Sequence, residues 1–222
     1  PAASASPMIL GSWFMEIPNA VDGQDEAFAG NTAVGSNQLG QFTPYWVNSN
    51  GQITLEPLDT GNDYDQPFYQ TTFKSGKAAI VEPYPYDIDG KSVSMTSVTF
   101  PVMSGGKMIG VAGLDLALDT VSAELGALRP FGDGRVMLVS PEANWVSHPD
   151  AKLRMKPYGD PGLERVKGVM TDGKAVLLPG LEQSIGKVER LVTPAPLPGL
   201  NSTWAVVMDV PTKHITGPAR TL

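Results

Sequence analysis

The chain contains no cysteine and only two histidines among its 222 residues. The lack of cysteine excludes disulfides, thiolate metal sites and thiol catalysis, although it fits a reducing cytosol and a bacterial periplasm equally well. No His-x-x-x-His zinc motif, phosphate-binding loop or Gly-x-Ser-x-Gly elbow is present. A Ser-His-Asp triad assembles only in space, but nothing in the sequence points to one. We therefore expect no enzymatic activity, no cofactor and no bound metal.

Positive charge is also scarce, because 16 Lys and Arg stand against 23 Asp and Glu, which gives a net charge of −7. Nucleic acid and anionic membrane surfaces need clustered basic residues, so neither is an expected partner, whereas a cationic ligand meets a favourable field. No run of about 18 apolar residues exists, and no basic region precedes an apolar one at the N-terminus. We expect no membrane span and no signal peptide here, so any membrane contact requires segments outside this sequence.

A strand pattern that occurs twice is the main positive feature of the sequence. An offset of 92 residues separates Val47 from Val139, and an offset of 94 separates Asp115 from Asp209, each within a similar apolar context. A near-constant offset predicts one structural unit built twice. The 41% hydrophobic content suffices for a core, and the 24 glycines and 20 prolines are typical of short strands joined by many turns.

Turn residues and periodicity predict the individual elements. Asn50-Gly51 predicts a hairpin of 43–47 with 53–55, and Ser104-Gly105-Gly106 predicts one of 91–102 with 107–118. Helices are expected over 67–76, over 120–128 after an N-cap at Asp119, and over 162–170. A closing hairpin pairs 188–194 with 202–210. Two antiparallel sheets with short flanking helices make an α+β architecture, which we divide into modules 1–128 and 129–222.

Many short segments in order resemble the double-Cache extracytoplasmic sensing domain of bacterial methyl-accepting chemotaxis receptors, which also occurs on histidine kinases and diguanylate cyclases. The likeness covers roughly residues 9 to 212 and implies two PAS-like modules, of which the first, membrane-distal one binds a small molecule. It also implies a periplasmic location and a homodimer in the full receptor. The segments are Met15-Glu16-Ile17-Pro18-Asn19-Ala20, Asp22-Gly23, Pro44-Tyr45-Trp46, Glu82-Pro83-Tyr84-Pro85-Tyr86, Gly90-Lys91, Met95-Thr96-Ser97, Gly110-Val111 with Asp115, Pro130-Phe131-Gly132-Asp133-Gly134 and Asn144-Trp145-Val146-Ser147-His148-Pro149.

Asp115 is the first candidate for ligand binding. Strand alternation puts Ile109, Val111, Gly113 and Asp115 on one face, where a carboxylate among apolar side chains needs a partner and Gly113 leaves room for one. In the amino-acid-binding relatives the matching Asp accepts the ligand ammonium. The alternative is a structural carboxylate that caps a turn or accepts main-chain N–H groups.

Aromatic and acidic residues complete the predicted site. Carboxylates beside aromatic faces make a cation site, since each ring adds roughly 0.5 to 2 kcal/mol of cation–π attraction. The alternatives are exposed tyrosines in a Pro-rich connector and tryptophans that are simply core. The predicted ligand-binding residues are Trp13, Glu16, Tyr45, Trp46, Asp63, Tyr64, Glu82, Tyr84, Tyr86 and Asp115.

The segment 62–69 decides the expected ligand class. It resembles the Arg-x-Trp-Tyr segment of amino-acid-binding relatives, but Gln66 stands where their Arg clamps the ligand carboxylate, and Tyr86 stands where they tend to carry an Asp. A neutral amide does not replace a guanidinium. An amine is therefore favoured, either choline-like, a betaine or a polyamine.

Several alternatives remain open. One alternative is that the alignment of segment 62–69 with the Arg-x-Trp-Tyr segment is off by a residue or two. Another is that the ligand is a purine, an amino acid or an organic acid. The acidic stretch 59–65 lacks the spacing of a calcium loop and reads better as a solvated turn. Besides a sensor and an enzyme, the third possible class of function is a purely structural or interaction module whose aromatic residues form the core.

Overall fold

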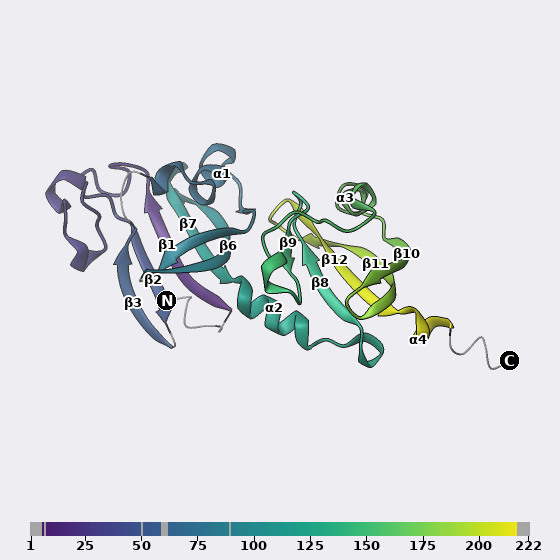
Figure 1. Cartoon of the computed structure of the whole chain (residues 1–222). Helices are drawn as coiled ribbons and strands as arrows, with labels where there is room; N and C mark the ends of the chain where they lie inside the picture. The colour runs from purple at the N-terminus through teal and green to yellow at the C-terminus, as the bar shows by residue number, and fades with distance from the viewer. Residues whose placement is uncertain (1–5, 7, 50, 59–61, 89, 217–222) are drawn as a thin grey trace. The chain divides into compact units, whose positions relative to one another are not determined.

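The computed structural model describes residues 6, 8–49, 51–58, 62–88 and 90–216 (Figure 1). They form two compact units, each with its own antiparallel sheet, in agreement with the predicted α+β class. Unit 1 contains the chain up to Val81, Pro85–Ala117 and Gly199–Asn201, and unit 2 contains Glu82–Tyr84, Leu118–Pro198 and the chain from Ser202 onward. The helix expected at the end of the first module thus belongs to unit 2.

The sheet of unit 1 has the strand order β3-β2-β1-β7-β6-β4, and β5 also pairs with β6. One helix, α1, lies over it (Figure 1). The elements are β1 (Ile9–Glu16), β2 (Pro44–Ser49), β3 (Gln52–Pro57), α1 (Pro67–Ser75), β4 (Ala79–Ile80), β5 (Tyr84–Ile88), β6 (Lys91–Ser104) and β7 (Lys107–Ala117). Short 3-10 turns at Asp25–Phe28, Thr32–Val34 and Asp63–Asp65 occupy the connections. Asn50 of the predicted turn and residues 59–61 of the acidic stretch lie outside the described residues.

Local sequence accounts for these elements. Pro67 opens α1 at a position that needs no N–H donor, and Gly76 ends it in the left-handed conformation at φ 64°. In β7, Val111, Gly113 and Asp115 are buried while Ala112 and Leu114 are half-buried, as strand alternation predicted. Thr72 of α1 and Thr99 of β6 hydrogen-bond through their hydroxyls at 2.6 Å, which fixes the helix on the buried face.

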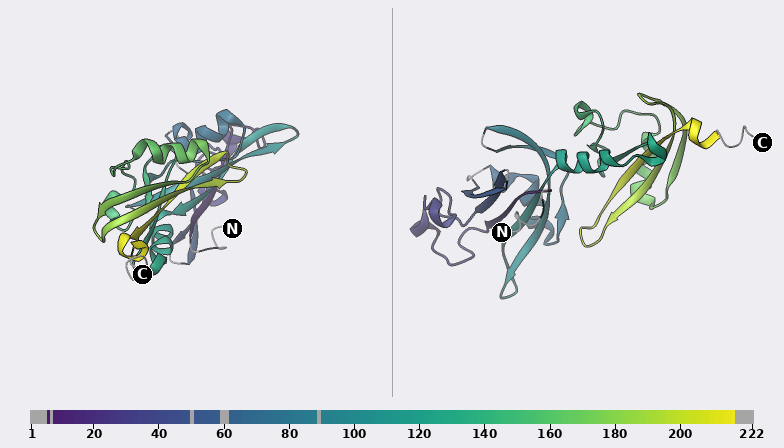
Figure 2. Two further views of the ribbon diagram at one scale, coloured as in Figure 1. Left: turned by 90° about the vertical axis from the view of Figure 1, so that its right-hand side faces the viewer. Right: turned by 90° about the horizontal axis from the view of Figure 1, so that it is seen from below.

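The sheet of unit 2 has the strand order β10-β11-β12-β8-β9. Val166 and Val169 of α3 join Met137, Trp145 and Val207 in its buried core, and α2 packs against β8 and β9. The long hairpins of both sheets carry the usual strand twist (Figure 2). The elements are α2 (Leu118–Ala127), β8 (Arg135–Val139), β9 (Trp145–Ser147), α3 (Leu163–Asp172), β10 (Val176–Gln183), β11 (Gly186–Leu197), β12 (Ser202–Pro211) and α4 (Thr212–Thr216), with 3-10 turns at Pro130–Gly132 and Ala151–Leu153. No helix among the described residues is both long and apolar enough to cross a membrane.

Of the two sequence matches that indicated an internal repeat, the structure agrees with Asp115 and Asp209 but not with Val47 and Val139. β7 and β12 hold the same place in their sheets, so Asp115 and Asp209 correspond as predicted. The neighbour of β7 is β1, however, and the neighbour of β12 is β8. The sequence match of Val47 with Val139 paired β2 with β8 and was therefore wrong by one strand. Both strands are apolar and lead into a hairpin, so the local pattern did not distinguish them.

Candidate functional site

Asp115 lies in the buried face of unit 1 at the centre of a polar and aromatic cluster. Its side chain accepts hydrogen bonds at Oδ1 from the Trp13 indole N–H at 2.9 Å and the Ser97 hydroxyl at 2.6 Å. Asp115 is 3% exposed and forms no ion pair within the described part of the chain. Burial raises the pKa of Asp115, and the hydrogen bonds from Ser97, Trp13 and Tyr45 only partly oppose this effect.

Strand pairing explains why these residues meet. Trp13 on β1 stands opposite both Tyr45 on β2 and Gly113 on β7, while Asp115 stands opposite Gly11 and Ser97. Residues directly opposite share a face of the sheet, so all of them point to the side that α1 covers.

The glycines make room for rings in this cluster. A Cβ at Gly113 would lie 2.2 Å from the Trp13 indole, and one at Gly11 would lie 2.3 Å from the Tyr45 ring. The space that the sequence suggested for a ligand beside Gly113 is therefore occupied by Trp13.

Further aromatic rings extend the cluster along α1. Trp13 meets Phe68 edge-on at 5.5 Å between ring centroids, and Phe68 meets Tyr86 at 6.2 Å. Tyr64 packs edge-on against Tyr69 at 4.9 Å. Of the predicted residues, Trp13, Tyr45, Tyr86 and Asp115 are thus brought into one group, and Phe68 is an unpredicted member. We call Trp13, Tyr45, Phe68, Tyr86, Ser97 and Asp115 the Asp115 cluster.

Two other predicted residues hold a loop together. Glu16 accepts main-chain N–H groups from Val21 at 2.7 Å and Phe42 at 2.9 Å, one on each carboxylate oxygen. Tyr64 donates its hydroxyl to the Glu16 carbonyl at 2.6 Å, and burial, together with the nearby Tyr69, raises the pKa of Tyr64 far above its usual value. Both residues have the contacts of structural groups.

The remaining predicted residues lie elsewhere. Trp46 stands opposite Ser12, so it points to the other face of the sheet from Asp115. Asp63 is half-buried in the turn before α1, and Tyr84 is half-buried at the start of β5. Glu82 precedes that strand and belongs to unit 2, where it accepts hydrogen bonds from the Ser140 hydroxyl at 2.5 Å and the Glu142 N–H at 3.0 Å. Glu82 therefore lies outside the strand that carries Tyr84 and Tyr86.

In unit 2, an arginine side chain lies at the position that corresponds to the Asp115 cluster. Asp209 is fully buried and binds Arg190 through two hydrogen bonds of 2.6 and 2.8 Å. The Arg190 guanidinium carbon lies 5.7 Å from the ring centres of both Trp145 and Tyr158. Burial alone would lower the pKa of Arg190, but the hydrogen bonds and the charge of Asp209 raise it. Asp160 accepts a further hydrogen bond from Arg190 at 2.6 Å, so the guanidinium is held charged between two carboxylates and two rings.

Sequence reasoning missed this group because Arg190 and Asp209 are 19 residues apart and lie on neighbouring strands. Their direct pairing across β11 and β12 was implied by the predicted closing hairpin once its register is known. The same register argument, applied to β6 and β7, would have identified Ser97 as the residue opposite Asp115.

Comparison with known proteins agrees with the motifs. Residues 13–123 match the family described as methyl-accepting chemotaxis protein-like, first PDC sensor domain. The chain is 32% identical over 239 residues to methyl-accepting chemotaxis protein TlpQ of Pseudomonas aeruginosa, with 100% of this chain and 33% of that protein covered. It therefore spans about a third of the length of that relative.

Solved structures show the same fold. Methyl-accepting chemotaxis protein X aligns with a TM-score of 0.83 and 40% identity, over 94% of this chain and 77% of that one. The extracellular domain of mmHK1S-Z3, described as a histidine kinase, aligns with a TM-score of 0.83 and 26% identity, over 100% of this chain and 79% of that one. The chain belongs to the methyl-accepting chemotaxis protein-like PDC sensor domains, the double-Cache class that its motifs resemble, and is a ligand-binding module and not an enzyme.

Proposed function

We propose that this chain is the periplasmic sensor domain of a chemoreceptor and that unit 1 binds a small cationic amine or quaternary ammonium compound. Choline-like molecules, betaines and polyamines are the candidate ligands. The observation that carries the proposal is Asp115, a buried carboxylate that forms no ion pair within the described residues but has the aromatic side chains of Trp13 and Tyr45 as hydrogen-bond partners.

A buried carboxylate without a cation is costly, and burial shifts it toward its neutral form. A bound ammonium group supplies the missing positive charge and favours the ionised form again. The Ser97 hydroxyl and the Trp13 indole N–H lower the free-energy cost of burying the charged carboxylate, but neither donor carries a full charge. The Asp115 cluster is therefore selective for the charge of its ligand.

The rings of the Asp115 cluster favour the same ligand class. Trp13 and Tyr45 hydrogen-bond Asp115, and Phe68 and Tyr86 extend the ring contacts from Trp13. A cation over such faces gains roughly 0.5 to 2 kcal/mol per ring, depending on desolvation. Quaternary ammonium groups depend on rings, whereas primary amines need several hydrogen-bond acceptors. The excess of rings over acceptors favours the quaternary head.

The second unit supports this chemistry from within the same chain. At the position corresponding to Asp115, Asp209 holds the Arg190 guanidinium between two aromatic rings. A cation, a buried carboxylate and two rings are thus a combination that this fold accommodates. In unit 1 we propose that the ligand supplies the cation that Arg190 supplies in unit 2.

The nature of position 66 argues against a clamp for an α-carboxylate. Gln66 is exposed and donates its amide to the Asn62 carbonyl at 3.2 Å. A ligand with an ammonium group and no α-carboxylate requires no guanidinium there.

Binding must change the contacts of Asp115, because Trp13 and Ser97 already occupy its Oδ1. We propose that the ligand displaces or shares these donors and so shifts a conformational equilibrium of β1 and β7. In the full receptor, membrane segments outside this chain would transmit the shift, with chemotaxis as the output and a homodimer as the assembly.

The test is a thermal-shift screen of choline, glycine betaine, putrescine, spermidine, amino acids, organic acids and purines. A ligand at 100 times its Kd stabilises the protein by about 2.7 kcal/mol. We expect a shift with at least one amine and a loss of affinity of more than about tenfold in Asp115→Asn, which corresponds to about 1.4 kcal/mol. A shift produced only by amino acids, dicarboxylates or purines would overturn the ligand class, and unchanged amine affinity in Asp115→Asn would place the site elsewhere.

A further inference from the structure

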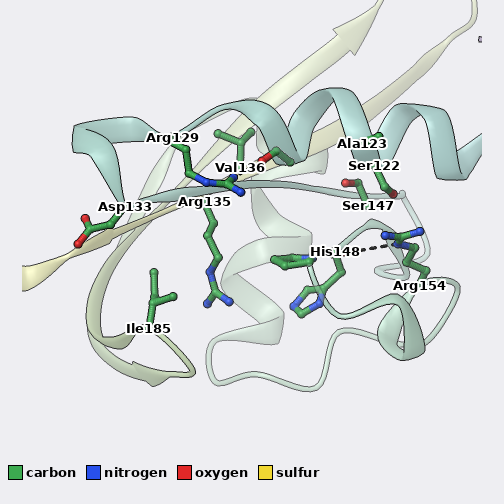
Figure 3. Close-up of a pocket in the computed structure, with 12 residues that line it drawn as sticks. Ser122, Ala123, Arg129, Asp133, Arg135, Val136, Ser147, His148, Arg154 and Ile185 are labelled. Atoms are coloured by element: carbon green, nitrogen blue, oxygen red, sulfur yellow. Dashed lines mark hydrogen bonds between the residues drawn. The ribbon is translucent and has the colours of Figure 1, made fainter.

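Unit 2 contains a cavity of about 430 Å³ that is lined by basic side chains (Figure 3). Arg129 follows α2, Arg135 begins β8, and Arg154 directly follows the 3-10 turn after β9. Three of the 16 basic residues of a chain with net charge −7 therefore border one cavity. Such a concentration against the overall charge favours an anion locally.

Arg135 is the arginine of this group that has a buried donor without an acceptor among the described residues. Its side chain is buried, and its Nε has no hydrogen-bond partner in the part of the chain that the structure describes. Asp209 is bound to Arg190 at 2.6 and 2.8 Å, while Arg135 reaches the same carboxylate only at 3.3 Å. Its other bonds go to neutral groups, Ser184 at 3.0 Å and Gln183 at 3.4 Å. A buried donor without an acceptor calls for a partner of its own, and an oxyanion is the strongest one available to a guanidinium.

His148 and Ser122 add donors to the same cavity. The Asp150 N–H donates to His148 Nδ1 at 3.0 Å, so the neutral ring carries its proton on Nε2. Burial, and after it the charge of Arg135, lowers the pKa of His148, which keeps the ring neutral. The Ser122 hydroxyl is buried and has no hydrogen-bond partner among the described residues. The polar lining thus offers two buried donors, Arg135 Nε and the Ser122 hydroxyl, for which the described residues supply no acceptor.

The acidic residue of the lining is already compensated. Asp133 accepts from Lys213 and His214, both at 2.6 Å, and these contacts hold its pKa below the usual value. It therefore adds little repulsion to an anion at the opposite wall. Val136 and Ile185 give the cavity an apolar part as well.

We propose that this cavity binds a small organic carboxylate. The carboxylate group faces Arg135 and His148, and the carbon skeleton packs against Val136 and Ile185. The volume exceeds what an inorganic anion fills, which favours an organic acid of a few carbon atoms. Ser122 lies on α2, the helix that follows β7 directly in the chain, so the bound acid contacts the segment that connects the two units in sequence.

Isothermal titration of the chain with lactate, succinate, acetate and inorganic phosphate tests the proposal. We expect at least one carboxylate to bind, Arg135→Gln to weaken it by at least about tenfold, and Arg165→Gln to leave it unchanged. Arg165 is the matched control because it is an exposed arginine of α3 outside the cavity. The proposal would be overturned if no carboxylate bound at about 10 mM, a concentration well above a Kd of about 1 mM. Binding of phosphate alone would also overturn it.

Two additions keep the test decisive. Because Arg135 also contacts Asp209 in the core, Arg129→Gln provides an exposed variant that removes charge from the cavity, and it should weaken binding about threefold or more. The His148 ring resonances, assigned by comparison with His214→Gln, should shift on adding the carboxylate, and unshifted signals would contradict the site. Asp115→Asn should retain carboxylate binding, so this proposal and the amine proposal fail independently.

Discussion

The strongest test of the Asp115 cluster compares two matched substitutions, Asp115→Asn in unit 1 and Asp209→Asn in unit 2. Both residues are buried carboxylates at corresponding positions on β7 and β12, and both changes are nearly isosteric. Of the two, only Asp209 has cationic partners in the described structure, Arg190 at 2.6 Å and Arg135 at 3.3 Å. The two substitutions should therefore change stability in opposite directions.

Asp209→Asn removes one partner of a buried ion pair and leaves Arg190 with Asp160, at 2.6 Å, as its remaining carboxylate. Such a loss costs about 3 to 5 kcal/mol. With about 2 to 4 °C per kcal/mol for a protein of this size, the melting temperature should fall on the order of 10 °C. Asp115→Asn removes a charge that burial disfavours, while the amide oxygen still accepts from Trp13 and Ser97. It should stabilise the ligand-free domain at pH 7, by about 1.4 kcal/mol for each unit by which the folded-state pKa is raised.

The pH dependence gives a second readout. Because the pKa of Asp115 is raised in the folded state, the folded protein holds this proton to a higher pH than the unfolded chain. Its contribution to stability is present below the unfolded pKa of about 3.9 and is lost as pH rises through the folded value. The stability advantage of Asp115→Asn over wild type should grow with pH in calorimetric scans between about pH 4 and pH 8. A loss of more than about 1 kcal/mol in Asp115→Asn at every pH would show that the carboxylate is a structural acceptor and would refute the reasoning.

Three further predictions concern single residues. Gly113→Ala should destabilise unit 1 by about 1 to 3 kcal/mol and weaken amine binding, because the added methyl group meets the Trp13 indole at 2.2 Å; normal melting and normal affinity would contradict this contact. Glu82→Gln should destabilise unit 2 by about 1 to 2 kcal/mol, because it weakens the hydrogen bonds to Ser140 and Glu142, and it should leave amine affinity unchanged. A loss of amine affinity in titrations of this variant would show that Glu82 belongs to the ligand site. Amine affinity should fall as pH is lowered through the raised pKa of Asp115, since the protonated carboxyl no longer attracts a cation, and a flat profile in wild type would count against direct contact.

The regular elements were largely predictable because their signals are local. Ser104-Gly105-Gly106 fixed the hairpin of β6 and β7, and Gly76 with Pro67 fixed both ends of α1. β10 was missed because Pro179 and Gly180 interrupt its pattern at the point where its register with β11 shifts. Asp119 was expected as an N-cap, but α2 begins at Leu118 and Asp119 pairs with Arg154 at 2.5 Å instead. That contact joins residues 35 apart in sequence and has no local signal.

Strand alternation predicted which face of its own strand a candidate residue occupies, but not which residues of other strands lie beside it. Alternation placed Asp115 on the buried face, but it gave no information on which strand stands beside β7, and that neighbour brings Trp13 to the carboxylate. Tyr45 and Trp46 looked equivalent in sequence, yet adjacent strand residues point to opposite faces, so only Tyr45 reaches the cluster. Glu82 looked like a neighbour of Tyr86, but it lies outside the strand and hydrogen-bonds within unit 2.

The two proposals follow from one difference between the repeated units. In unit 2, Arg190 neutralises Asp209, so the position that we propose binds a cation in unit 1 is closed to a ligand cation. Because Asp209 forms its shortest hydrogen bonds with Arg190, Arg135 has a longer contact with it at 3.3 Å. Arg135 also borders the cavity with an Nε that no described residue accepts from. The internal ion pair that removes a cation site therefore creates the conditions for an anion site. On this argument the two units should respond to ligands of opposite charge, and saturating either site should leave the charge preference of the other intact.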